Sequence, residues 1–322
     1  MNDALLEVNR LSVGYKVEDG WLSAVHDVSF AIRKGEFFAL VGESGCGKST
    51  IASTIMRLSL DHNERLEGEV RFEGHDLIRA TEPEMEAIRG SGIGMIFQNP
   101  LDSLNPVYTV GWQIDEALRA GGMDARSARK RTVELMEAVQ IPDAARRANA
   151  FPHELSGGMR QRVMIAMMLS RSPRLLIADE PTTALDVTVE AQILEIMKDM
   201  RDRTGASVLM ITHNFGIVAE TADHVGIMYA GELVECGSVY EIFARPSHPY
   251  SFALLNALPR RRKRDGRIQT IEGTVPRILG ESRGCRFANR CPRAMDCCRT
   301  EAPPRRELGA DHWMRCHLEV NA

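Results

Sequence analysis

The chain has 322 residues, of which 44% are hydrophobic and 26% charged, an ordinary composition for a folded globular protein. This length allows one large domain with a smaller one beside it. No apolar run approaches the roughly 20 residues that span a bilayer, and the start of the chain, with Asp3, lacks the layout of a signal peptide. We therefore expect a cytoplasmic chain, in which structural disulfides are rare.

The net charge of −4 is unevenly distributed. Residues 246–322 contain fifteen Lys and Arg against eight Asp and Glu, whereas residues 1–245 contain 25 against 36. The basic part includes the run RRRKR at 260–264, which is typical of a solvated linker and less often of a contact with nucleic acid or anionic lipid. With the nearby prolines, this shift predicts a boundary within 245–265, between domains 1–245 and 246–322.

The first strong motif is a short apolar run, a glycine-rich turn and a helical segment. Phe37–Val41 is typical of a strand buried on both faces, and residues 49–58 have a helical pattern. The turn fits the P-loop G-x-x-x-x-G-K-[ST], whose backbone N–H groups surround phosphate oxygens. Lys48 would reach the β- and γ-phosphates, and the Ser49 hydroxyl would bind Mg²⁺. The predicted nucleotide-binding residues here are Gly42, Ser44, Gly45, Cys46, Gly47, Lys48, Ser49 and Thr50, with Cys46 serving only as a small turn residue.

Three later motifs carry further candidate residues. In LSGGM at 155–159, Ser156 precedes a Gly-Gly pair that opens a long helix. This arrangement is a second anion-binding device, although one nucleotide needs only one P-loop. The apolar strand that starts at 174 ends in Asp179, placed to hold Mg²⁺, and Glu180, placed to act as general base on a water. The buried strand SVLMIT at 207–212 is followed by His213.

The order P-loop, FQNP, LSGGM, LLIADEP, ALD and ITH resembles that of the ATP-binding cassette (ABC) ATPases over about residues 4–245. The resemblance implies an α/β P-loop NTPase fold with a RecA-like core, an antiparallel β subdomain and an α-helical subdomain. It implies that Gln98 contacts Mg²⁺ and the attacking water and that His213 contacts the γ-phosphate. It further implies that Tyr15 stacks on adenine and that Asp186 communicates across a dimer.

The same resemblance accounts for the second anion-binding device. In such ATPases, two cassettes associate head to tail, so that Ser156 and Gly158, with Gly157 between them, cap the nucleotide in the P-loop of the second subunit. The implied catalytic residues are therefore Glu180, His213 and Gln98, and the implied Mg²⁺ site consists of Ser49, Gln98 and Asp179.

The remaining chain is similar to the C-terminal extension of dipeptide and oligopeptide importer ATPases, most closely to D-type subunits of dipeptide permeases. The similar segments are 103–114, 245–259, 271–276 and 284–292. This implies an ATP-hydrolysing subunit at the cytoplasmic face of the bacterial inner membrane. Its partners would be a second, homologous cassette, two membrane-spanning permease subunits and an extracytoplasmic substrate-binding protein. The alternative is a mechanical ABC ATPase acting on nucleic acid or ribosomes, which the single uninterrupted cassette speaks against.

Five of the seven cysteines lie in the last 38 residues. The spacing of Cys285, Cys291, Cys298 and Cys316 resembles the four-cysteine pattern that holds a [4Fe–4S] cluster in this subfamily. We interpret Cys297 as the spare thiol, because adjacent residues of an extended segment face opposite ways. Zn²⁺ on the same thiolates and free thiols remain alternatives. Because the extension is remote in sequence from the P-loop, we expect the cluster to stabilise it or its docking rather than to take part in hydrolysis.

Overall fold

The computed structural model describes residues 4–58, 63–98, 103–182, 186–257, 271–280 and 282–319. The chain forms two compact units, which are described separately: Met1–Ala80 with Ile211–Ala322, and Thr81–Met210. Both sides of the predicted boundary at residue 245 lie in the first unit. The RRRKR run falls outside the described residues.

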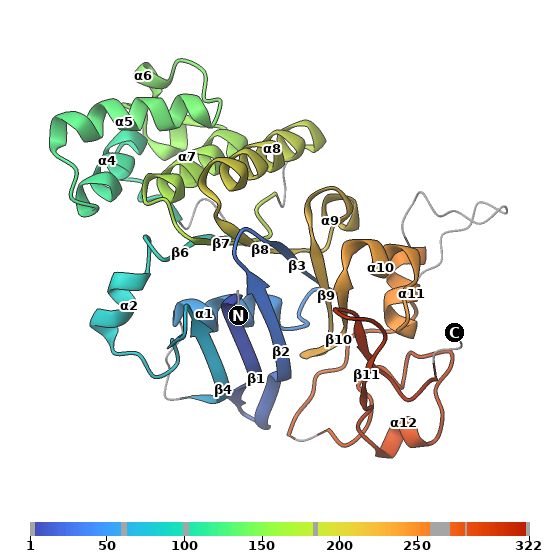
Figure 1. Ribbon diagram of the computed structural model, residues 1–322. Coiled ribbons are helices and arrows are strands. Elements are labelled where there is room, and N and C mark those ends of the chain that lie inside the picture. The colour runs from blue at the N-terminus through green and yellow to red at the C-terminus, as the bar shows by residue number, and fades with distance from the viewer. Residues whose placement is uncertain are drawn as a thin grey trace. The chain divides into compact units, whose positions relative to one another are not determined.

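The first unit begins with an antiparallel sheet in the order β2-β1-β4-β5 (Figure 1). Along β1, apolar side chains such as Leu6, Val8, Leu11 and Val13 are buried. A sheet with one buried face produces this kind of pattern, and it confirms the predicted antiparallel β subdomain. The strands are β1 (Ala4–Val17), β2 (Gly20–Arg33), β4 (Glu64–Phe72) and β5 (His75–Asp76).

The same unit contains strands in the order β11-β12-β10-β9-β3. All five residues of β3 are buried, which confirms the predicted apolar strand, and β3 runs parallel to β9. The strands are β3 (Phe37–Val41), β9 (His224–Tyr229), β10 (Glu232–Ser238), β11 (Arg305–Glu307) and β12 (Trp313–Arg315). The helices are α1 (Lys48–Met56), α9 (Phe215–Thr221), α10 (Val239–Ala244), α11 (Pro249–Asn256) and α12 (Cys297–Thr300).

The second unit combines two parallel strands with the predicted helical subdomain. Strand β6 (Ile93–Ile96) pairs with β7 (Leu175–Asp179), and β8 (Ser207–Thr212) begins in this unit and ends in the first. Helices α4, α5 and α7 pack on one another. The helices are α2 (Glu82–Ile88), α4 (Val110–Ala120), α5 (Ala125–Ala138), α6 (Ala144–Arg147), the short 3₁₀ helix η1 (Pro152–Glu154), α7 (Gly157–Ser170) and α8 (Val187–Thr204). Within the described ranges, no helix has the length and apolarity that a membrane span needs.

The C-terminal extension is docked on the first unit by an aromatic cluster. Phe287 is 1% exposed, and its ring centroid lies 5.0 Å from that of Tyr229 and 5.2 Å from that of Tyr250. His248 adds a tilted contact to the same ring, at 5.9 Å. The extension, which includes α11, therefore shares a core with β9 through Tyr229, which explains how so short and charged a segment is held in place.

Replacing the ring of Phe287 should destabilise the first unit. We expect Phe287→Ala to lower the free energy of unfolding by about 3–5 kcal/mol, because the change opens a cavity in a fully buried cluster. Phe252 is 55% exposed on α11, so Phe252→Ala should change stability by less than about 0.5 kcal/mol. Denaturant titration of both variants measures the difference, and equal losses would contradict the proposed core.

Candidate functional site

The predicted site residues are divided between the two units. The first contains Tyr15, the P-loop and His213, and the second contains the remaining predicted residues, namely Gln98, Ser156, Gly157, Gly158, Asp179, Glu180 and Asp186. Asn99 and Pro100 of the FQNP motif, and Ala184 and Leu185 of the ALD motif, lie outside the described residues. Each part of the site is therefore described within its own unit.

The P-loop is seated closely between two strands of the first unit. A Cβ atom at Gly42 would lie 2.3 Å from the carbonyl oxygen of Met228 at the end of β9. A Cβ at Gly47 would lie 2.4 Å from the carbonyl oxygen of Ala24 on β2, and Gly47 also has a φ of 101°. Only glycine fits this path, because any side chain at either position would push the loop off its neighbouring strand.

Lys48 is curled into the loop that precedes it. Its side chain is buried, and its Nζ donates to the carbonyl oxygens of Gly42 at 2.9 Å and Glu43 at 3.0 Å. Ser44, Gly45 and Ser49 are exposed on the loop, and Thr50 is half-buried. The ammonium group is thus fixed at the centre of the loop, where a phosphate group would find a positive charge and exposed backbone.

Cys46 does more than occupy a turn. It is 1% exposed, and its Sγ lies 3.6 Å from Lys48 Nζ. Burial raises the pKa of this thiol, so it is protonated at neutral pH and adds no charge beside the lysine. Its side chain packs inside the loop, and the predicted role of Cys46 as a small turn residue stays a prediction.

In the second unit, the structure brings together Gln98 and Glu180. Asp179 ends β7 and is buried, and Glu180 follows it with a positive φ of 45°. Non-glycine residues in this region cost on the order of 1–3 kcal/mol, and such strain concentrates at functional positions. Gln98 Nε2 donates to Glu180 Oε2 at 3.1 Å, which orients the carboxylate and leaves the amide oxygen of Gln98 as an acceptor. Hard oxygen donors of this kind, with the Asp179 carboxylate of the same unit, suit Mg²⁺.

The glycine pair at 157–158 opens α7 as predicted. Ser156 caps the helix, its Oγ accepting from Met159 N at 3.4 Å, and both Ser156 and Gly157 are exposed. A Cβ at Gly158 would lie 2.8 Å from Val189 Cγ1, so α7 approaches α8 too closely for a side chain there. The first turn of α7 therefore presents backbone donors and the positive end of a 14-residue helix to solvent.

The three remaining predicted residues occupy the ends of their elements. Asp186 caps α8, its Oδ1 accepting from the amides of Thr188 at 3.1 Å and Val189 at 3.0 Å. His213 directly follows β8 and is exposed. Tyr15 is half-buried on β1 opposite Glu64 of β4. Asp186 thus has a structural role as a helix cap. The roles predicted for Asp186, His213 and Tyr15 stay predictions.

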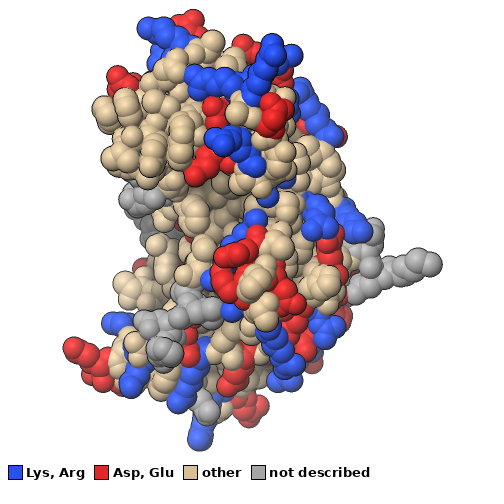
Figure 2. Space-filling view, turned by 90° about the vertical axis from the view of Figure 1, so that its left-hand side faces the viewer, with Lys and Arg blue, Asp and Glu red and all other residues tan. Residues whose placement is uncertain are grey.

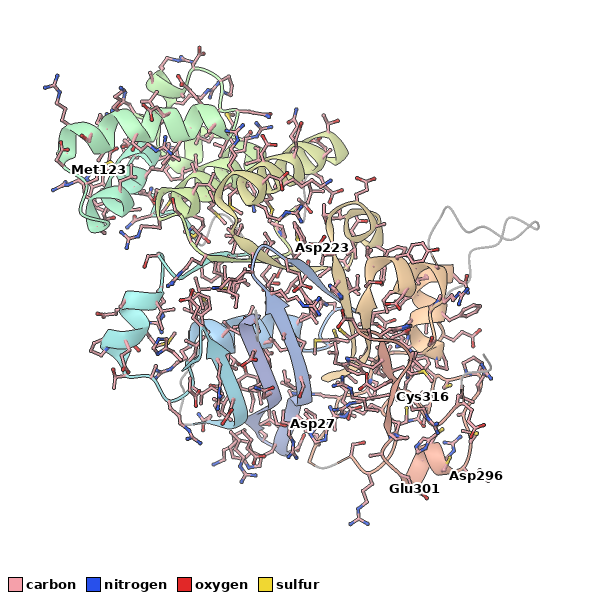
Figure 3. The ribbon with its side chains drawn as sticks, in the orientation of Figure 1. Asp27, Met123, Asp223, Asp296, Glu301 and Cys316 are labelled. Atoms are coloured by element: carbon pink, nitrogen blue, oxygen red, sulfur yellow. The ribbon has the colours of Figure 1, made fainter. Side chains whose placement is uncertain are left out.

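The extension's cysteines lie in one region, in part as predicted. Cys285 N donates to Cys298 O at 2.8 Å, and the thiols of Cys298 and Cys316 contribute to the raised pKa values of both Cys285 and Cys291. Desolvation is the main cause of these shifts, and it raises the pKa of Cys285 to about 12. The backbone hydrogen bond thus places Cys285 beside Cys298. Figure 3 places Cys316 in the part of the extension that also contains α12.

Two predictions about the cysteines need correction. Among the described residues, no three His, Cys, Asp or Glu side chains are grouped so as to hold a metal ion, so the structure supports neither the predicted [4Fe–4S] cluster nor the zinc alternative. The reason given for excluding Cys297 is wrong, because Cys297 and Cys298 open the helical turn α12 rather than an extended segment. Within that turn Cys298 is buried and accepts from Met295 N at 3.5 Å, whereas Cys297 is half-buried.

The structure adds one site residue that the motif did not single out. Glu43 occupies an unspecified position of the P-loop pattern, yet its carboxylate pairs with Arg290 of the extension, its amide donates to Tyr250 Oη, and its carbonyl accepts from Lys48. Nothing in the local sequence relates Glu43 to a residue 247 positions away.

Comparison with known families assigns both parts of the chain. Residues 25–183 match the family described as ABC transporter, and residues 234–298 match the family described as Oligopeptide/dipeptide transporter, C-terminal region. A putative peptide import ATP-binding protein of Brucella abortus is 49% identical over 91% of this chain and 89% of the relative. The dipeptide transport ATP-binding protein DppD of Bacillus subtilis is 44% identical over 98% of this chain and 95% of its own.

Solved structures agree with this assignment. The chain is similar to the ATP-binding cassette MJ0796 in a dimeric post-hydrolysis state bound to ADP and Pi, with a TM-score of 0.66 and 29% identity. That match covers 73% of this chain and 98% of the cassette. A second similar structure is cbiO1 from Clostridium perfringens, part of an ABC transporter complex, with a TM-score of 0.65 and 27% identity over 80% of this chain and 97% of the other. The chain therefore belongs to the ABC transporter ATPases and, within them, to the ATP-binding subunits of the dipeptide and oligopeptide importer family.

Proposed function

We propose that this chain is the ATPase subunit that powers the import of dipeptides or oligopeptides through a bacterial ABC importer. The observation that carries the proposal is the union of a P-loop and a peptide-transporter C-terminal region in one compact unit. Relatives named for dipeptide and for oligopeptide transport, similar over 98% of this chain, support the cargo class. The choice among dipeptides, longer peptides, glutathione and nickel complexes would belong to the receptor and permease subunits.

In the proposed reaction, ATP is the substrate and its phosphates lie in the P-loop beside Lys48. Bound Mg²⁺ would neutralise charge on the phosphate oxygens, with Ser49, Asp179 and Gln98 as its protein contacts. Glu180 accepts a proton from the attacking water, and the hydrogen bond from Gln98 keeps its carboxylate oriented for that step. His213 contacts the γ-phosphate, and Tyr15 stacks on the adenine ring.

The active unit in this proposal is a head-to-tail pair of cassettes. Ser156, Gly157 and Gly158 bind the phosphates held by the partner's P-loop, through the exposed N-terminus of α7. The dimeric state of a structurally similar cassette supports this arrangement. The second cassette is proposed to be a homologous, non-identical chain, and Asp186 at the start of α8 would communicate across the pair.

The membrane partners are proposed to be two permease subunits, with an extracytoplasmic substrate-binding protein, so that the chain works at the cytoplasmic face of the inner membrane. An exposed apolar surface on the second unit supports such docking. Val107 is 69% exposed, and the rings of Tyr108 and Trp112 stack at 4.0 Å with both side chains partly exposed at the start of α4. Aromatic side chains of this kind are the usual anchors of protein interfaces.

We propose that Cys285, Cys291, Cys298 and Cys316 hold a [4Fe–4S] cluster. The burial of Cys298 and Cys316, and the hydrogen bond from Cys285 N to Cys298 O, support a common site. A cluster is larger than one ion, so its ligands stand farther apart than those of a single-ion site. Binding would require the buried thiols to lose their protons. The cluster would cross-link the extension and would take no part in ATP hydrolysis.

The nucleic-acid alternative is not supported. The relatives are named for peptide import and transport. On the face that Figure 2 shows, Lys and Arg side chains are interspersed with Asp and Glu, whereas a nucleic-acid footprint gathers basic side chains on one surface.

Glu180→Gln should abolish catalysis while ATP still binds. Turnover should fall by about 10²–10⁴-fold, as is typical when a general base is lost, and an ATP-loaded dimer should accumulate. Phosphate release and size-exclusion chromatography with ATP measure the two effects. The matched control is Glu220→Gln, at an exposed acid on α9, and near-wild-type turnover of Glu180→Gln would refute the assignment.

Ser156→Arg should stop hydrolysis at the partner's site by filling the space that its phosphates occupy. ATP affinity at this chain's own P-loop should change little, because Ser156 lies in a different part of the chain. Ser127→Arg, at an exposed serine in the first turn of α5, is the control. Nucleotide binding and turnover of the assembled importer distinguish these effects. Full-rate hydrolysis by an isolated monomer would be incompatible with a shared site.

Cys298→Ser should remove the metal cofactor, whereas Cys297→Ser should retain it. Anaerobically purified protein should be brown and contain about four irons per chain, the stoichiometry of the cluster. Absorbance and elemental analysis of the full-length variants test this. Stoichiometric zinc without iron would reject the cluster and keep the four ligands, and metal-free protein would reject both.

A further inference from the structure

The C-terminal extension contacts the P-loop directly through one ion pair. Arg290 Nη1 lies 2.6 Å from Glu43 Oε2, and Arg290 Nη2 lies 3.0 Å from Glu43 Oε1, so the contact is bidentate. The Arg290 side chain is 6% exposed and that of Glu43 is 27% exposed. A bidentate, largely desolvated pair fixes geometry as well as charge, unlike an exposed surface pair.

Arg290 is itself held in one orientation by the residues around it. Its Nε donates to the carbonyl of Glu272 at 2.9 Å, and its Nη2 donates to the carbonyl of Ile271 at 3.3 Å. Its Nη1 lies 3.4 Å from Tyr229 Oη, at the end of β9. These contacts restrict rotation of the guanidinium group. A shift of the extension would therefore also move Glu43.

Glu43 connects this pair to the nucleotide lysine. Its carboxylate receives Arg290, while its carbonyl oxygen accepts from Lys48 Nζ at 3.0 Å. Its amide donates to the hydroxyl of the fully buried Tyr250 at 3.2 Å. Glu43 thus links two parts of the extension, Arg290 and α11, to Lys48, and it does so through its side chain, its amide and its carbonyl.

A second arginine supports the other end of the loop. Arg286 donates to the carbonyl of Ala230 at 2.5 Å and to Ser23 Oγ at 3.0 Å, and its Nε lies 3.0 Å from a Glu232 carboxylate oxygen. The next residue of the same turn, Gly231, donates its amide to the carbonyl of Cys46 at 2.9 Å. The extension thus braces the P-loop directly at Glu43 and, through the turn between β9 and β10, at Cys46.

We propose that Arg290 is a positioning residue for ATP binding, which acts through Glu43 to hold the P-loop and Lys48 in the nucleotide-binding conformation. The proposal rests on the proposed function, because it requires ATP to bind at this P-loop. It assigns to the extension a role in nucleotide affinity in addition to its stability.

The test is a double-mutant cycle on the assembled importer. Arg290→Ala and Glu43→Gln should each raise the KM for ATP by roughly 5- to 150-fold, the usual range of coupling between two sites, with a smaller change in kcat. The double variant should be no worse than the worse single variant, because both remove the same contact. Arg290→Lys should recover part of the loss, since lysine keeps the charge but not the bidentate geometry.

Arg277→Ala, at an exposed arginine of the same extension, is the control and should keep the wild-type KM. Metal content and thermal stability are measured for every variant. If an Arg290 variant loses metal or fails to fold, the test depends on Glu43→Gln, because Glu43 lies outside the extension. A wild-type KM in Glu43→Gln, or losses that add fully in the double variant, would overturn the proposal. Lys48→Ala tests the proposed function separately: retained ATP binding in that variant would show that the P-loop assignment itself is wrong.

Discussion

The close seating of the P-loop against two strands is the constraint on which the first unit depends. At Gly42 and Gly47 the main chain meets the carbonyl groups of β9 and β2 with no space for a side-chain carbon. The path of the loop is therefore set by the sheet, and α1 has to begin at Lys48, directly after the left-handed glycine. This places the lysine among the carbonyl groups of Gly42 and Glu43, so the loop itself holds the charge in position.

In the second unit, the site is organised by a different device. Glu180 adopts a left-handed backbone conformation that is unfavourable for glutamate, directly after a strand whose residues are all buried. The rigid end of β7 maintains this conformation, and Gln98 holds the carboxylate by a hydrogen bond from another loop. A strained backbone and an oriented side chain together would reduce the rearrangement required of Glu180 in its proposed role as general base.

The residues that sequence reasoning located well are those whose role depends on local pattern. A five-residue apolar run predicts β3, and a serine before two glycines predicts the start of α7, because burial and helix capping are decided by nearby residues. The helical turn at Cys297 was not predicted, since a four-residue helix has too little periodicity to recognise. The contact of Arg290 with Glu43 could not be predicted from the sequence either, because docking of the extension brings together residues from opposite ends of the chain.

The pairing of β12 with β10 determines where the sheet of the first unit ends. Met314 and Trp313 pair with Glu235 and Cys236, so the main-chain groups of β10 on that side are covered by the extension. The outermost strand is then β11, only three residues long and composed of Arg305, Arg306 and Glu307. Short, charged outer strands resist pairing with other molecules. A cassette ended after α10 would lose this protection, because the edge of β10 that pairs with β12 would be open to another strand.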